Sequence, residues 1–275
     1  MSDPRDRPIG VFDSGIGGLT VVRELVRQLP NESILYFGDT ARVPYGSKSA
    51  ETVGRYTDEA AALLRARDIK LLVIACNTAT AHACEPLAAR LPIPVVGVIE
   101  PGARSAARAT RTGRIGVIGT TGTIRSAAYD LAVRRRLPDA RVYAQPCPLF
   151  VPLVEEGWLD RPATRLIAEE YLEPLVGLDI DALILGCTHY PLLGPLIADI
   201  MGPGVSIVDS GEETATEVRS ALERNEILRA ASTPPTHTFL ASDAPHRFRE
   251  VGRRLVGAIV AEVGHVDTGD YGRAA

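Results

Sequence analysis

The sequence has very few lysines, and this absence limits the chemistry that the chain can perform. Only two of its 275 residues are lysines, Lys48 and Lys70. A pyridoxal phosphate enzyme needs a lysine to form a Schiff base with the cofactor. Lys70 begins an apolar segment that we expect to be a core strand, so only Lys48 could serve. The composition therefore argues against pyridoxal phosphate chemistry.

Cysteines are also few. The chain contains Cys76, Cys84, Cys147 and Cys187. Four cysteines without any Cys-x-x-Cys pair do not make a disulfide scaffold in a chain of this length. Zinc sites usually cluster cysteine and histidine, and neither Cys76 with His82 nor Cys187 with His189 has a familiar spacing. We therefore expect free thiols and no bound metal.

Long apolar segments and an excess of positive charge are missing as well. No stretch approaches the roughly 20 apolar residues of a membrane span, and the start, MSDPRDRPIG, lacks the pattern of a signal peptide. The formal net charge is −4, and the basic run at 134–136 is typical of a solvated helix face. We expect a cytoplasmic protein that binds neither membranes nor nucleic acid directly.

What the sequence does contain is a regular alternation of short apolar runs and amphipathic segments. Its apolar fraction of 45% and charged fraction of 23% are those of a soluble globular protein. The segments predicted to be strands are 9–12, 34–37, 70–75, 94–98, 114–119, 141–144, 181–186, 205–209 and 236–241. Helical patterns lie between most of them, for example at 20–29 and 164–176. The alternation predicts an α/β protein with parallel sheets flanked by helices.

Two parts of the chain resemble each other. The segments GVFDSGIGGLTVVRELVRQLP, from Gly10, and GVIGTTGTIRSAAYDLAVRRRLP, from Gly116, both read as strand, polar loop, helix and a closing Leu-Pro. The segments around Cys76 and Cys187 recur at a similar spacing of roughly a hundred residues, which indicates a duplication.

The duplication predicts two similar doubly wound, flavodoxin-like domains related by a pseudo-two-fold axis, with the active site between them. We assign residues 1–99 and 209–275 to a discontinuous first domain and residues 100–208 to the second. The two ends of the chain, MSDPRDR and 264–275, lack periodicity and are expected to be frayed.

Polar loops follow the predicted strands, where ligands bind in open α/β sheets. The loop DSGIGG at 13–18 is neither a dinucleotide fingerprint, because Thr20 occupies the place of the last glycine, nor a Walker loop. Its backbone N–H groups at a helix start suit a carboxylate. Asp13 would then be a partner for a proton or an ammonium group.

Cys76 and Cys187 each end an apolar run, in LLVIACNTATAHA and ALILGCTHYPLLG. A single cysteine at a strand end is usually a small buried hydrophobic residue. We expect the same packing role for Cys84, on the helix after Cys76, and for Cys147, between two prolines, because neither is followed by small polar residues. A matched pair in duplicated halves favours chemistry, and a helix N-terminus is expected to lower the pKa of each thiol. One thiol could remove a proton from a tetrahedral carbon while the other protonates the opposite face, which inverts the carbon. A cysteine hydrolase would instead need one nucleophile with a histidine base.

Several motifs resemble those of the glutamate racemase family, within the cofactor-independent aspartate/glutamate racemases: FDSGIGGLTV, GDTARVPYGSKS, ACNTATAHA, GVIGTTGTIRSAAY, PLFVPLVEEG and LGCTHYPLL. The resemblance implies an isomerase that interconverts L-glutamate and D-glutamate without a cofactor and supplies D-glutamate for peptidoglycan. It also implies a homodimer, because dimerisation is common in the family. Some members bind DNA gyrase, and the sequence neither supports nor opposes that partner.

The resemblance also implies residue roles. Cys76 would take the proton from D-glutamate and Cys187 from L-glutamate, with Asp13 assisting Cys76, and Glu155 and His189 assisting Cys187. The residues implied to hold the substrate are Asp13, Ser14, Tyr45, Gly46, Asn77, Thr78, Thr188, His189 and one or both of Thr120 and Thr123. A packed aromatic role for Tyr45 and a plain surface role for Glu155 remain alternatives.

Three other functions stay open at this point. An aspartate racemase would use similar two-cysteine logic, and comparing turnover of glutamate and aspartate would separate the two. A pyridoxal phosphate racemase would depend on Lys48. A protein that binds gyrase is the third possibility, which a pull-down with gyrase would test, and a catalytically dead double-cysteine variant would show whether that binding is separate from catalysis.

Overall fold

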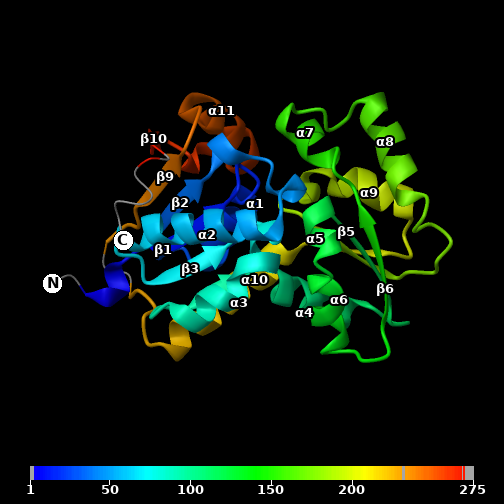
Figure 1. The fold of residues 1–275 in the computed structure, drawn as a ribbon, viewed down its shortest axis with the longest axis horizontal. Helices are drawn as coiled ribbons and strands as arrows, with labels where there is room; N and C mark the ends of the chain where they lie inside the picture. The colour runs from blue at the N-terminus through cyan, green and yellow to red at the C-terminus, as the bar shows by residue number, and fades with distance from the viewer. Residues whose placement is uncertain (1–2, 231–232, 268, 270–275) are drawn as a thin grey trace.

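The computed structural model describes residues 3–230, 233–267 and 269, which form two parallel β-sheets (Figure 1). The first sheet has the order β10-β9-β2-β1-β3-β4, with β1 at Ile9–Asp13, β2 at Ile34–Gly38, β3 at Leu71–Ile74, β4 at Val95–Gly97, β9 at His237–Ala241 and β10 at Val263–His265. The second has the order β6-β5-β7-β8, with β5 at Arg114–Gly119, β6 at Arg141–Pro146, β7 at Ala182–Gly186 and β8 at Ser206–Val208.

Helices connect the strands and cover the sheets. The α-helices are α1 Leu19–Gln28, α2 Ala50–Arg65, α3 Asn77–Arg90, α4 Ile99–Ala109, α5 Thr121–Arg125, α6 Ala128–Arg134, α7 Phe150–Glu155, α8 Pro162–Leu172, α9 Gly194–Met201, α10 Ser210–Arg224 and α11 Pro245–Val256. Short 3₁₀ helices are η1 Pro4–Asp6, η2 Thr40–Arg42, η3 Tyr45–Ser47, η4 Tyr190–Leu193 and η5 Gly257–Ile259. None of the helices in the described part of the chain has both the length and the apolar character needed to cross a bilayer.

Both faces of each sheet are buried, which explains why the strands read as nearly continuous apolar runs. In β1, Val11 packs with α1, α10 and α11, while its neighbour Phe12 points to the opposite face, against α2 and α3. In β5, Val117 packs with α4 and α6, and Ile118 with α7, α8 and α9. Each sheet is therefore the middle layer of a three-layer sandwich.

The two sheets share one strand order. The arrangement β2-β1-β3-β4 in the first sheet has its counterpart in β6-β5-β7-β8 in the second, and the described pairings are parallel. The predicted α/β class with two similar doubly wound units is confirmed. The domain boundaries after residues 99 and 208 remain a proposal, supported by the return of β9 to the first sheet after β8 has completed the second.

The ends of the chain are more ordered than we expected from the sequence. Residues 264 and 265 belong to β10, which pairs in parallel with β9, and η1 begins at Pro4, so the prediction of frayed ends is wrong for these residues. Residues 1–2, 268 and 270–275 lie outside the described residues. The predicted helix 164–176 ends earlier, at Leu172, because the chain then turns through left-handed backbone at Gly177 and Asp179.

Candidate active site

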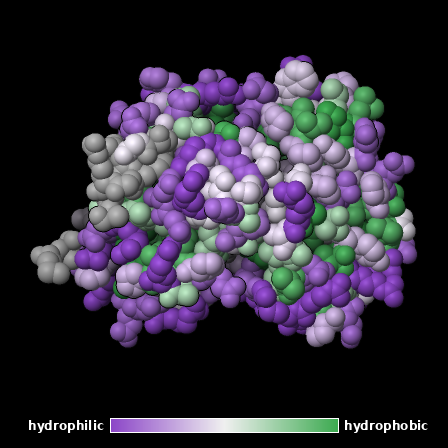
Figure 2. Space-filling view, viewed as in Figure 1, coloured by the Kyte–Doolittle hydropathy of each residue, from purple (hydrophilic) through white to green (hydrophobic). Residues whose placement is uncertain are grey.

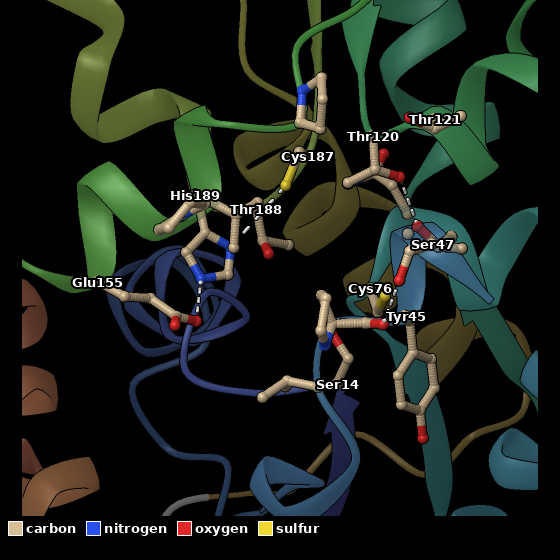
Figure 3. Close-up of a pocket in the computed structure, with 18 residues that line it drawn as sticks. Ser14, Tyr45, Ser47, Cys76, Thr120, Thr121, Glu155, Cys187, Thr188 and His189 are labelled. Atoms are coloured by element: carbon tan, nitrogen blue, oxygen red, sulfur yellow. Dashed lines mark hydrogen bonds and ion pairs between the residues drawn. The ribbon is translucent and has the colours of Figure 1, made fainter. Parts of the chain in front are cut away.

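A cavity of about 300 Å³ lies between the two sheets, at the carboxyl ends of their strands (Figure 3). Each group of lining residues follows a strand: Ser14 follows β1, Tyr45 and Gly46 follow β2, and Cys76 follows β3. From the second sheet, Thr120 follows β5 and Cys187 follows β7. The duplicated topology thus brings equivalent loops of the two halves to opposite walls of one cavity.

Both predicted thiols face this cavity, from its two sides (Figure 3). Cys76 is the N-cap residue of α3, and Cys187 lies between β7 and η4. Their exposed fractions are similar, 6% and 7%. Two cysteines that are far apart in the sequence therefore have almost equivalent positions around a cavity of a size that suits a small molecule.

Cys187 lies next to an imidazole that is itself bound to a carboxylate. Its Sγ is 3.8 Å from Nδ1 of His189, and Nε2 of His189 is 3.1 Å from Oε1 of Glu155. Burial lowers the pKa of His189, but the hydrogen bonds and charges of Cys187 and Glu155 outweigh burial and raise that pKa to about 10. Burial raises the pKa of Glu155, but the hydrogen bond and charge of His189, followed by the charge of Arg247, outweigh burial and lower it. The arrangement favours an imidazolium between a carboxylate and the sulfur.

This pair predicts a pH dependence of stability. The pKa of His189 is raised above 6.5 in the folded protein, so its contribution to the free energy of unfolding is complete below pH 6.5 and is lost as the pH rises to about 10. Glu155→Gln removes the carboxylate that raises this pKa. We expect the stability difference between wild type and variant, measured by urea unfolding, to be largest near pH 6.5 and to shrink toward pH 10.

Glu156→Gln is the matched control, because Glu156 is the next residue, is exposed and pairs with Arg247 instead. We expect this variant to differ little from wild type over the same pH range. A stability difference for Glu155→Gln that did not change with pH would contradict the charged pair.

The surroundings of Cys76 are different. Burial, followed by the negative charge of Asp13, raises the pKa of the Cys76 thiol to about 12, and hydrogen bonds from Ser14 and from the N–H of Ala79 offset only part of this. The expectation that the helix N-terminus lowers the pKa is therefore wrong for Cys76, because desolvation of a thiolate outweighs the helix. This environment favours the neutral thiol of Cys76 at pH 7.

Asp13 lies under the cavity wall and is fully buried. Its Oδ2 accepts a 2.9 Å hydrogen bond from the N–H of Gly15, and its Oδ1 is 3.5 Å from the hydroxyl of Thr188. Burial raises the pKa of Asp13, and the positive charge of His189 partly opposes this. Asp13 thus connects the loop after β1 with the loop that carries Cys187.

Close packing fixes the position of these two loops. A Cβ atom at Gly17 would lie 2.3 Å from Oγ1 of Thr188 and 2.5 Å from Nδ1 of His189, so only glycine allows this approach. The hydroxyl of Thr20 also donates to the carbonyl of Thr188 at 3.2 Å. The glycine-rich loop is therefore a contact surface for the Cys187 loop rather than a phosphate loop.

On the other side, η3 and α3 contact α5. The hydroxyls of Thr78, Thr120 and Thr123 lie within 2.9 to 3.1 Å of one another, and a Cβ at Gly46 would lie 2.4 Å from that of Thr120. The hydroxyl of Tyr45 donates to buried Asp39 at 2.5 Å and points away from the cavity (Figure 3). Tyr45 therefore lines the cavity while its hydroxyl is bound elsewhere, and its ring packs against Phe12, which is closer to the alternative of a packed aromatic.

Most residues that the sequence implied for the site do line the cavity. These are Ser14, Tyr45, Gly46, Cys76, Asn77, Thr78, Thr120, Glu155, Cys187, Thr188 and His189. Asp13 and Thr123 do not line it, although both contact residues that do. The sequence reasoning missed Val43, Pro44, Ser47, Thr121, Pro148, Val151 and Pro152. All seven lie within the quoted motifs, but they are apolar or lie beside residues with more obvious chemistry, so their residue types alone do not mark them as site residues.

Among the described residues, no group of three or more His, Cys, Asp or Glu side chains could hold a metal ion. The site consists of thiols, carboxylates, an imidazole and hydroxyls between two similar sheets.

Residues 9–218 match the family model described as Asp/Glu/Hydantoin racemase. The chain belongs to this racemase family. It is 55% identical over 257 residues to the glutamate racemase of Geobacter metallireducens, covering 94% of this chain and 95% of that one. The resemblance inferred from the sequence motifs is confirmed, and the chain is an isomerase.

Solved structures of the family have the same fold. The glutamate racemase isoform RacE1 of Bacillus anthracis gives a TM-score of 0.92 at 42% identity, covering 96% of this chain and 98% of that chain. The glutamate racemase of Francisella tularensis, solved in complex with D-glutamate, gives 0.90 at 39% identity with the same coverage. The expected homodimer and the gyrase alternative remain predictions for this racemase.

Proposed function

We propose that this racemase interconverts L-glutamate and D-glutamate by proton transfer at Cα, with Cys76 and Cys187 as the two acid–base groups. The observation that supports this most directly is the pair of sulfurs on opposite sides of one small cavity (Figure 3). Glutamate as the substrate is supported by the names of the similar proteins, one of which is a complex with D-glutamate. In a cell, this activity would supply D-glutamate for peptidoglycan.

In the direction from L-glutamate, Cys187 is the base. The imidazolium of His189, 3.8 Å from its sulfur, stabilises the thiolate, and Glu155 holds the imidazolium in place. The thiolate takes the Cα proton from one face of the carbon. Cys76, a neutral thiol at pH 7, then gives its proton to the opposite face, and the carbon is inverted.

In the direction from D-glutamate, Cys76 must first lose its proton. Asp13 is the carboxylate beside it, and the raised pKa of Asp13 makes it a better proton acceptor than an exposed aspartate. Cys187 then delivers the second proton. The two thiols exchange the roles of acid and base, while each keeps its own assisting groups.

The walls of the cavity suit the charged groups of glutamate. α3 and α5 begin at the cavity and present N–H groups and hydroxyls, including those of Thr78 and Thr120, to a substrate carboxylate. The negative charges of Glu155, which lines the cavity, and of Asp13, buried behind the wall, favour the ammonium group. Both charges of the amino-acid backbone would thus be held while Cα lies between the sulfurs.

The experiment that tests this proposal is racemisation of L-glutamate by the purified chain in deuterated water, after dialysis against a chelator and with no added cofactor. Circular dichroism should decay to zero, because the two enantiomers have equal free energy. Early product should carry deuterium at Cα, whereas recovered substrate should remain almost unlabelled, since different groups act on the two faces. The same assay with L-aspartate is the specificity control and should proceed much more slowly.

Several outcomes would overturn the proposal. If the dichroism signal stayed constant until pyridoxal phosphate or a metal was added, the cofactor-free mechanism would be refuted. Equal early labelling of substrate and product would indicate one base rather than two. Faster turnover of aspartate would make this chain an aspartate racemase.

A further inference from the structure

Tyr129 lies between the two loops that carry the cysteines. It belongs to α6, is buried, and donates a 2.7 Å hydrogen bond from its hydroxyl to Oδ1 of Asn77, the residue after Cys76. Its ring packs over Gly186, the residue before Cys187, since a Cβ built there would lie 3.0 Å from Cε2 of Tyr129. One side chain therefore contacts the immediate neighbours of both thiols.

The hydroxyl contact crosses from one sheet system to the other. Asn77 begins α3, which follows the first sheet, whereas Tyr129 lies on a helix that covers the second. The side chain of Ser210, at the start of α10, also hydrogen-bonds the Tyr129 hydroxyl. Tyr129 thus lies between Gly186, at the end of β7, and Asn77, at the start of α3.

The partner of the hydroxyl is itself at the cavity. Asn77 lines the cavity and is 3% exposed, and its Nδ2 is buried without a hydrogen-bond partner in the described part of the chain. A buried amide N–H₂ without a partner costs free energy, which a carboxylate in the cavity could recover by accepting a hydrogen bond. Because the Tyr129 hydroxyl donates to Oδ1, Nδ2 is left as the free donor of the Asn77 amide.

We infer that Tyr129 is a positioning residue for racemisation: through its hydroxyl it orients the Asn77 amide toward the substrate, and through its ring it holds the Cys76 and Cys187 loops in register. This inference rests on the proposed glutamate racemisation. Tyr129 does not touch the reacting atoms, so its effect on the reaction passes through Asn77.

Tyr129→Phe tests the hydroxyl alone, because the phenyl ring keeps the packing against Gly186 and Gly102. We expect kcat/KM for both enantiomers to fall roughly ten- to hundredfold, since Asn77 loses the group that orients it. In the Asn77→Ala background, Tyr129→Phe should have almost no further effect. Tyr143→Phe, in β6, is the control and should match wild type.

A readout that does not depend on turnover accompanies the kinetics. Saturating D-glutamate should raise the unfolding temperature of wild type, and should raise that of Tyr129→Phe by less, because the variant binds the ligand more weakly. Wild-type kinetics in Tyr129→Phe, an equal temperature rise, or effects that simply multiply in the double variant would overturn the positioning role. Failure of wild type to racemise glutamate would instead refute the proposed function, so the two failures are distinguishable.

Discussion

Cys76→Ala and Cys187→Ala are each expected to abolish racemisation in both directions, lowering kcat by about a thousandfold or more. In a two-base reaction each turnover needs one thiol to remove a proton and the other to supply one, whichever enantiomer is the substrate. Loss of either sulfur therefore stops the reaction in both directions, and not only in the direction in which that sulfur is the base. The measurement is kcat from each enantiomer, followed by circular dichroism.

Cys84→Ala and Cys147→Ala are the matched controls. Burial is the main cause that raises the pKa of these thiols, to about 11 and about 12, as it is for Cys76, but neither thiol lines the cavity. We expect both variants to retain nearly full activity. Full activity in Cys187→Ala, or loss of activity in Cys84→Ala equal to that in Cys76→Ala, would contradict the pairing of Cys76 with Cys187.

The two halves repeat the backbone but not the polar groups around each thiol. The strand order is the same in both sheets, whereas Cys76 lies beside Asp13 and Cys187 beside the His189–Glu155 pair. If the two sulfurs act on opposite faces of Cα as proposed, the base in each direction of the reaction has different assisting groups: Asp13 for Cys76, and the His189–Glu155 pair for Cys187.

Much of the architecture could be predicted from the sequence because it depends on local patterns. Buried parallel strands read as apolar runs, and the ten- to twenty-residue helical segments between them imply parallel connections. β10 was missed, since Val263–His265 is short, contains a central glycine and is a strand only by pairing with β9. Local pattern does not encode that pairing.

Site residues could be predicted from the sequence when their side chains have obvious chemistry. Residues that belong to the site only because of their place in the fold could not. The cysteines, Asp13 and His189 stand out by type, whereas the apolar wall at Pro148 and Val151 does not. The thiol pKa of Cys76 was expected to be low from its helix N-terminus, and burial reversed the direction. The burial of Cys76 and contacts between the halves, such as that of Tyr129 with Asn77, depend on how distant segments of the chain pack together. The sequence pattern of one segment does not show this.

Gly17→Ala is expected to cause the next largest loss of activity, although it removes no functional group. A Cβ at this position would lie 2.3 Å from Oγ1 of Thr188 and 2.5 and 2.6 Å from Nδ1 and Cε1 of His189. Neither can yield without leaving its place, because Thr188 is β-branched and the His189 ring is held by Glu155. We expect kcat/KM to fall about a hundredfold for both enantiomers, as for a catalytic group displaced by about 1 Å.

Gly54→Ala is the control for this substitution, because a Cβ at Gly54 would meet no atom within 4 Å and the residue lies inside α2. It should retain full activity and raise stability by roughly 0.5–1 kcal/mol, since alanine is the better helix former. In Gly17→Ala, displacement of His189 should also remove the pH-dependent part of the stability that depends on its contacts with Cys187 and Glu155. Gly17→Ala could instead show wild-type kcat/KM and an unchanged pH profile of urea unfolding. The Cys187 loop could then shift without consequence, and contact between the two loops would not be what holds His189 against the sulfur.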